Sequence, residues 1–248
     1  GSMDEKSSNQ AKKTKLEDTK DAINALVGVF ANEDKKVDVQ YKLVTFSDSS
    51  SIKTDKWVSG DGLKKEVESL TAKGGTNYDK GLAKAATAIN SSTREGAKKI
   101  VIFLTDGQPT YYGDGPKGYG NQTSKSTLDA AIESARKISC SGFYAVGIGL
   151  PDTTNIYTHD GTLNNQGNLK WNHGHWEGNW WSKEWVDDPC PDGGKNQDGY
   201  DVYEQISGLE ILTRVANATS ANTKEPINLS SSSELTDKFK DIAGETLN

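Results

Sequence analysis

Two polar clusters in this chain carry side chains that could bind a metal ion. "KGGTNYDKG" (73–81) opens a predicted helix and contains Thr76, and "FLTDGQPT" (103–110) ends a predicted buried strand at Asp106. In open α/β sheets, ligands bind outside the carboxyl ends of the strands, close to the point where the strand order reverses. Hydroxyl and carboxylate oxygens are hard donors, which suit Mg²⁺ or Ca²⁺ rather than Zn²⁺. The two clusters therefore predict a divalent-cation site.

Each cluster also has an ordinary structural interpretation. Thr76 followed by Asp79 fits a helix N-cap, and Asp106-Gly107 fits a turn. The joint placement favours the site, because one cluster precedes a helix and the other follows the most apolar strand.

The elements that must position these residues alternate between helices and strands. Apolar spacing predicts helices over 14–30, 62–70, 77–90, 126–138 and about 208–217, a last helix containing Leu235, Phe239 and Ile242, a hairpin from 37–46 and 51–58, and strands at 100–104, 143–150 and 226–229. This alternation predicts an α/β fold with a doubly wound, mostly parallel, Rossmann-like sheet. The pattern begins with a helix, whereas the first helix of such a sheet normally follows a strand.

Several segments together resemble a known family. "GSM", "KLEDTKDAINALV", "LVTFSD", "GGTNYDKGL", "IVIFLTDGQPT" and "FYAVGIG" occur in the order found in von Willebrand factor type A (vWA) domains. The resemblance implies a metal-ion-dependent adhesion site, built from an Asp-x-Ser-x-Ser loop, a Thr and an Asp. Carried over to this chain, the metal ligands are Ser2, Thr76 and Asp106, and the cation is Mg²⁺, or else Mn²⁺ or Ca²⁺.

The resemblance also concerns the start of the sequence. Gly1-Ser2-Met3 is either the tail of a native metal-binding loop or the remnant of a cloning site, and we favour the native loop. The first, central strand of the family is missing from this sequence. Such a strand contributes about four to five buried apolar side chains, each worth ~1.5–3 kcal/mol. We therefore expect an upstream segment or a second chain to supply the strand and the Asp-x-Ser.

A Trp-rich segment interrupts the α/β pattern. The predicted vWA domain comprises residues 1–150 and 206–248, and residues 151–205 form an insertion between the fifth strand and the following helix. Five tryptophans lie between Trp171 and Trp185. Trp176, Trp180 and Trp181 are candidate ligand-binding residues, because tryptophan offers a large rigid surface with a polar handle. The competing interpretation is that most of the tryptophans form a small core of the insertion.

The cysteines and the net charge limit the cellular location and the kinds of partner that we expect. Cys140 and Cys190 permit one disulfide, the alternative being two buried thiols. A net charge of −6 with both signs interspersed argues against a nucleic-acid partner. No apolar run is long enough to insert in a membrane. A disulfide implies an extracellular location.

These observations predict a non-enzymatic adhesion module on a cell surface, attached to a cell wall or pilus. Its insertion, its possible disulfide and its Lys/Asn/Ser/Thr-rich sequence resemble those of pilus-tip and cell-wall adhesins of Gram-positive bacteria. This resemblance implies a host protein or glycan as ligand, bound in part through an acidic group. One alternative is a structural or assembly domain of a surface fibre with a degraded metal site. Another is an ATPase-associated or sugar-active enzyme subunit, although the sequence contains no phosphate loop and no nucleophile with a base at workable spacing.

Overall fold

The computed structural model describes residues 2–6, 13–31, 37–91, 94–118, 120, 122–157, 162–163, 169–170, 174–179, 182, 184–187 and 202–247. Six α-helices lie within these ranges, namely α1 (Lys15–Ala31), α2 (Gly60–Glu68), α3 (Tyr78–Asn90), α4 (Lys125–Ala135), α5 (Gly208–Ala218) and α6 (Leu235–Leu247), with short 3₁₀ helices at Ser2–Asp4 and Ser232–Glu234. The bounds agree with the helices predicted from apolar spacing. Thr14 and Glu17 form the predicted reciprocal cap of α1, since each side chain accepts a hydrogen bond from the other residue's backbone N–H.

The strands form a parallel sheet around β5, the β1–β2 hairpin, a small sheet of β4, β6 and β11, and two short pairs within the Trp-rich segment. They are β1 (Val44–Phe46), β2 (Ser50–Ile52), β3 (Ile100–Thr105), β4 (Thr123–Ser124), β5 (Gly142–Ile148), β6 (Thr154–Tyr157), β7 (Thr162–Leu163), β8 (Leu169–Lys170), β9 (Gly174–Glu177), β10 (Glu184–Asp187), β11 (Val202–Ile206), β12 (Asn222–Thr223) and β13 (Ile227–Leu229). The predicted hairpin is present as the antiparallel pair β1–β2, but its strands are shorter than the predicted 37–46 and 51–58, and beyond them Tyr41 and Val58 form an isolated bridge.

The sheet is centred on β5. Strand β3 runs parallel to β5 on one side, from Ile100 opposite Gly142 to Thr105 opposite Gly147. Strands β12 and β13 follow one another on the other side, also parallel to β5. Among the described residues β3 pairs with β5 alone, and β1 and β2 form a separate two-stranded sheet.

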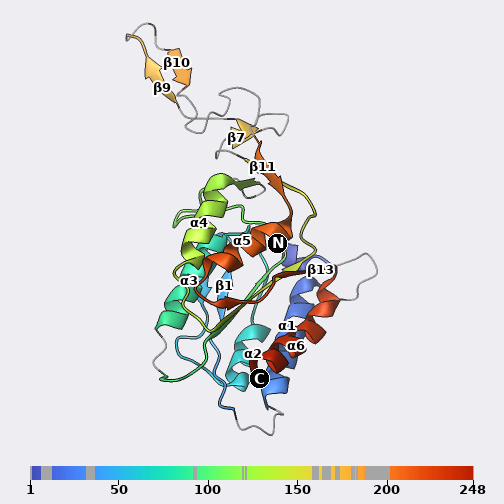
Figure 1. The fold of residues 1–248 in the computed structure, drawn as a ribbon. Helices are drawn as coiled ribbons and strands as arrows, with labels where there is room; N and C mark the ends of the chain where they lie inside the picture. Colours follow the sequence, from blue (N-terminus) through green and yellow to red (C-terminus); the bar gives the residue numbers. More distant parts are fainter. Residues whose placement is uncertain are drawn as a thin grey trace.

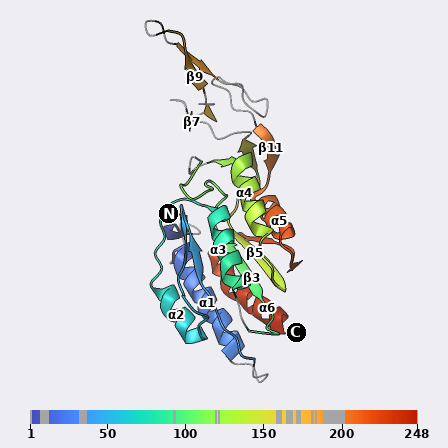
Figure 2. The same cartoon turned by 90° about the vertical axis from the view of Figure 1, so that its left-hand side faces the viewer.

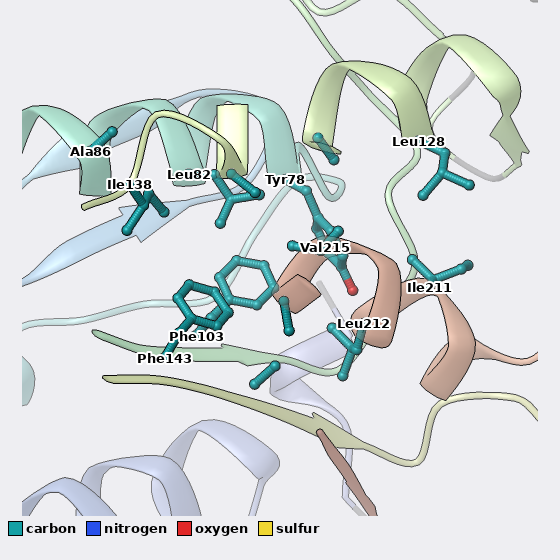
Figure 3. Close-up of a cluster of buried hydrophobic side chains, with 14 of the residues drawn as sticks. Tyr78, Leu82, Ala86, Phe103, Leu128, Ile138, Phe143, Ile211, Leu212 and Val215 are labelled. Atoms are coloured by element: carbon teal, nitrogen blue, oxygen red, sulfur yellow. The ribbon is translucent and has the colours of Figure 1, made fainter. Parts of the chain in front are cut away.

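Helices cover both faces of this sheet (Figure 1), and β5 shows why. Phe143 and Ala145 point into one apolar cluster with α3, α4 and α5. Tyr144, Val146 and Ile148 point into a second cluster with α1 and α6. Successive side chains of a strand point to opposite faces, so a strand buried on both sides must be apolar throughout. Figure 3 shows the first cluster, in which Phe103 of β3 lies beside Phe143.

The chain leaves this body after β5 and returns at β11. β6 and β11 pair antiparallel, with Tyr157 opposite Val202, and β4 pairs with β6. Strands β9 and β10 lie far beyond this pair, at the end of the molecule opposite to the C-terminus (Figures 1 and 2). In the part of the chain that is described, no helix is long and apolar enough to cross a bilayer.

Candidate functional site

The first predicted ligand, Thr76, lies in the loop just before α3. The N-cap of α3 is its neighbour Asn77, whose Oδ1 accepts from the Lys80 N–H at 3.0 Å. The capping interpretation of Thr76 is therefore wrong by one residue. Asn77 is completely buried and also donates to the Asp48 carbonyl at 3.0 Å, which fixes the loop. Since Asn77 satisfies the helix terminus, the hydroxyl of Thr76 is not needed there.

The backbone of Thr76 is held from the opposite side by the segment that follows β3. Its carbonyl accepts from the backbone N–H groups of Thr110 at 2.8 Å and Tyr111 at 3.1 Å. A Cβ added to Gly107 would lie 3.1 Å from Thr76 Oγ1. The Thr76 hydroxyl therefore faces the turn that contains Asp106 and Gly107, and Gly107 leaves the room for it.

The second predicted ligand, Asp106, follows directly after β3. Asp106 and Gly107 lie in a bend, as the turn interpretation predicts, and the buried Thr105 holds this bend: its Oγ1 accepts from the Gly107 N–H at 3.3 Å and donates to the Gly107 carbonyl at 2.9 Å. The hydroxyl of Tyr78 donates to the same carbonyl at 2.6 Å. Burial raises the pKa of Tyr78 well above its usual range, so this donor stays protonated. The carboxylate of Asp106 is thus left to make other contacts.

The third predicted ligand, Ser2, meets Asp106 directly. Ser2 Oγ donates to Asp106 Oδ1 at 2.8 Å across 104 positions of sequence. Ser2, Thr76 and Asp106 therefore come from three separate segments to the carboxyl end of β3. Among the described residues, no three His, Cys, Asp or Glu side chains are grouped so that they could hold a metal ion by themselves. Two hydroxyls and one carboxylate are nevertheless hard oxygen donors, so this set fits Mg²⁺, Mn²⁺ or Ca²⁺.

Two residues at the site were not predicted from the sequence. Lys15, the first residue of α1, places its Nζ 3.3 Å from Asp106 Oδ2. Asp48 follows β1 and accepts a hydrogen bond from the Gly75 N–H with Oδ1, which holds the loop that carries Thr76. The sequence signals for Asp48 were its place at the end of the family-like segment LVTFSD and in a turn after a predicted strand.

A hydrogen-bond network connects the Asp106 turn to the base of the Trp-rich segment. Gln108 Nε2 donates to Thr154 Oγ1 of β6 at 2.5 Å, and Thr123 Oγ1 of β4 donates to Gln108 Oε1 at 3.1 Å. Both threonines are buried. One side chain two residues from Asp106 therefore bonds to β6, through which the chain leaves the body, and to β4, which pairs with β6.

The structure describes the other predicted residues only in part. The backbone of Trp176 lies in β9, opposite Trp185 of β10, whereas Trp180 and Trp181 lie outside the described residues. Cys140 is partly buried and packs against the first core cluster. Cys190 also lies outside the described residues, so the disulfide stays a prediction.

The N-terminal part of the sequence is similar to known proteins. Residues 1–108 match the family model described as von Willebrand factor type A domain. Inter-alpha-trypsin inhibitor heavy chain H6 of Homo sapiens is 27% identical over 114 residues, which cover 39% of this chain and 8% of that protein.

Among solved structures, the pilus adhesin SpaC of Lactobacillus rhamnosus GG superimposes with a TM-score of 0.60 at 16% identity, covering 93% of this chain and 28% of SpaC. The PilB minor pilin of Streptococcus sanguinis gives a TM-score of 0.61 at 15% identity, covering 99% of this chain and 58% of PilB. At these identities the likeness is one of fold. The chain spans less than two thirds of the length of each of these three proteins.

Proposed function

Because the chain contains a von Willebrand factor type A domain, we propose that it is a non-enzymatic adhesion module that binds a protein or glycan through a divalent cation. The observation that carries the proposal is the meeting of Ser2, Thr76 and Asp106 at the carboxyl end of β3. In a purely structural role Thr76 would cap α3, but Asn77 is the cap. The Thr105 hydroxyl, and not the Asp106 carboxylate, bonds to Gly107 in the turn.

Each residue has a distinct role in this proposal. Asp106 supplies the negative charge, and Ser2 and Thr76 supply neutral oxygens on either side of it. A bound cation would leave coordination positions for an acidic group of the ligand, as the family resemblance implies. The Trp-rich segment would add contact area, since Gln108 connects its base to the Asp106 turn. The fold shared with pilus proteins supports a location outside the cell, on a cell wall or pilus.

Calorimetric titration with Mg²⁺ and Mn²⁺ tests the cation. We expect saturable binding by the wild type that is lost in Asp106→Ala and retained in Asp237→Ala, a control whose carboxylate is 88% exposed on α6. Retention of binding in Asp106→Ala would contradict the proposal. For the ligand, a glycan array probed with the wild type and Trp180→Ala separates a sugar from a protein partner.

One observation favours a second candidate, a structural domain of a surface fibre with a degraded metal site. The ammonium of Lys15 already neutralises Asp106. In that case neither Mg²⁺ nor Mn²⁺ would give heat with the wild type.

We further propose that the free edge of β3 accepts one more strand. Within the described residues β3 pairs on one side only, although its side chains face both apolar clusters. An unpaired apolar edge leaves backbone groups without partners and invites another strand.

The occupant that fits best is the segment that precedes Gly1 in the same polypeptide. Ser2 lies at the carboxyl end of β3, 2.8 Å from Asp106. A strand running parallel to β3 along its free edge would end at that point, and the chain would continue into α1. Such a strand would also deliver the Asp-x-Ser that the family resemblance implies.

Hydrogen exchange tests this proposal. In a polypeptide that includes the preceding residues, we expect amides of residues 100–105 to exchange at least roughly tenfold more slowly than in the chain alone. Equal exchange rates would contradict it. Protection that appears in the chain alone and rises with protein concentration would identify a second copy as the donor of the strand.

A further inference from the structure

Lys15 and Asp106 form a shielded ion pair at the candidate cation site. Lys15 Nζ lies 3.3 Å from Asp106 Oδ2, and the two side chains are 14% and 8% exposed. The more typical pair Lys13–Asp21 is about half exposed on both sides. Shielding from water strengthens the attraction between two charges. The ammonium of Lys15 is therefore held firmly against this carboxylate.

Each carboxylate oxygen of Asp106 already has a hydrogen-bond donor. Ser2 Oγ donates to Oδ1, and Lys15 Nζ donates to Oδ2. A divalent cation bound to Asp106 would lie within a few ångströms of the ammonium. The two positive charges would repel each other strongly in a site with so little solvent. The cation and the Lys15 ammonium cannot both stay on Asp106.

The backbone around Lys15 is fixed, so only its side chain is free to leave. The Lys15 N–H donates to the Glu5 carbonyl at 2.9 Å, and Thr14 bridges to Lys6. Thr14 also caps α1 together with Glu17. The flexible four-carbon stem of lysine allows its ammonium to swing toward water while α1 stays in place.

We propose that the Lys15 ammonium occupies the cation position of this site and that a divalent cation must displace it in order to bind. This inference rests on the proposed function, because it concerns the same site. Lys15 then keeps the cation-free protein neutral at Asp106 and weakens its affinity for the cation. The concentration of the cation that switches adhesion on is set by this lysine.

Two variants test the competition. Lys15→Met keeps most of the stem and removes the charge. Lys20→Met is the control, since Lys20 lies on the same helix and donates to the Glu68 carbonyl, away from the site. In calorimetric titrations with Mn²⁺, we expect Lys15→Met to bind roughly tenfold tighter than the wild type, as coupling between close charges suggests. We expect Lys20→Met to bind as the wild type does.

A second measurement follows the displacement itself. Reductive methylation with mass spectrometry reports how accessible each lysine amine is. We expect saturating Mn²⁺ to increase the labelling of Lys15 in the wild type, while Lys13, which is exposed, is labelled equally with and without the cation. Unchanged labelling of Lys15 in the cation-bound protein would overturn the displacement.

The outcomes separate this inference from the proposed function. If the wild type binds Mn²⁺ and Lys15→Met binds equally or more weakly, the inference fails and the cation site stands. If neither protein binds Mn²⁺, the inference and the cation site both fail.

Discussion

At the scale of residues, Thr76 and Asn77 are neighbours with opposite roles. Asn77 caps α3 and is buried, whereas the Thr76 hydroxyl makes no hydrogen bond within the part of the chain that the structure describes. We expect Thr76→Val to change the free energy of unfolding by less than about 0.5 kcal/mol and to weaken Mg²⁺ binding at least roughly tenfold. Thermal unfolding and calorimetry measure the two effects.

Asn77→Ala, in contrast to Thr76→Val, should destabilise the protein strongly. Loss of the cap and of its buried partners should lower the free energy of unfolding by about 2 kcal/mol or more. Thr76→Ser keeps the hydroxyl and should bind Mg²⁺ nearly as the wild type does. A Thr76→Val variant that is as destabilised as Asn77→Ala, with unchanged affinity, would return Thr76 to a structural role.

Asp48 is expected to act on the cation through Thr76. Its carboxylate accepts a hydrogen bond from the Gly75 N–H. The neighbouring Gly74 has a φ of 84°, and a Cβ added there would lie only 3.0 Å from both carboxylate oxygens of Asp48. We expect Asp48→Ala to lose about 1.5–3 kcal/mol of stability, typical of a hydrogen bond to a charged group, and to bind Mg²⁺ several-fold more weakly. Asp55→Ala, at an exposed position, serves as the control. A stable Asp48→Ala variant with normal affinity would show that the loop holds without it.

The Cys140 thiol offers a test of the predicted disulfide. Burial raises the pKa of this thiol, and the thiolate is the reactive form. If Cys140 is free, iodoacetamide should label it slowly at about pH 7.5 and faster as the pH rises, because the thiolate fraction grows through the raised pKa. A disulfide with Cys190 would instead block labelling at every pH until a reductant is added.

The site residues that the sequence predicted share a simple property. Thr76 and Asp106 belong to local motifs at the ends of predicted elements, so their neighbourhood followed from topology alone. Lys15 and Asp48 contact these motifs across 91 and 27 positions, respectively. A lysine in the first turn of an amphipathic helix and an aspartate in a turn have ordinary surface roles. Only the packed structure distinguishes Lys15 and Asp48 from the other lysines and aspartates of the chain.

At the scale of elements, periodic apolar segments were predictable and short polar strands were not. Helices α1 and α3 and strands β3 and β5 bury regular apolar faces, and their bounds followed from that spacing. Strands β4, β6 and β11 are short and depend on each other for pairing, and three of the four buried residues of β4 and β6 are polar, namely Thr123, Ser124 and Thr154. Their sequences carry polar and β-branched residues that fit loops equally well. Tertiary pairing decides their structure.

Gln108 should matter for these short strands. Gln108→Ala leaves the hydroxyls of Thr123 and Thr154 without this partner in a buried position, which should cost about 1–3 kcal/mol. We expect hydrogen exchange to accelerate in residues 123–124 and 154–157 while β5 stays protected. Uniform acceleration over the whole sheet would show that Gln108 supports the entire fold and does not act on the insertion alone.

At the scale of the whole molecule, we expect the Trp-rich segment to be an addition to the scaffold formed by the parallel sheet and its helices. Among the described residues, Ile156 is the only member of either core cluster that lies within the insertion, and Leu150 and Ile206 flank it. The β6–β11 pair closes the scaffold, and Tyr157 lies opposite Val202 in register. A two-residue Asn-Gly turn joins antiparallel strands at such a position.

Replacing residues 158–201 by Asn-Gly should therefore leave the domain folded. We expect its Tm to change by no more than about 4 °C, which corresponds to about 1 kcal/mol for a domain of this size, and its Mn²⁺ affinity to match that of the full chain. Binding to a glycan or protein ligand that uses Trp176, Trp180 or Trp181 should be lost in the shortened protein. If the shortened protein unfolds or no longer binds Mn²⁺, the insertion is part of the scaffold, because removing it must then have disturbed the Asp106 turn through Gln108 and β6.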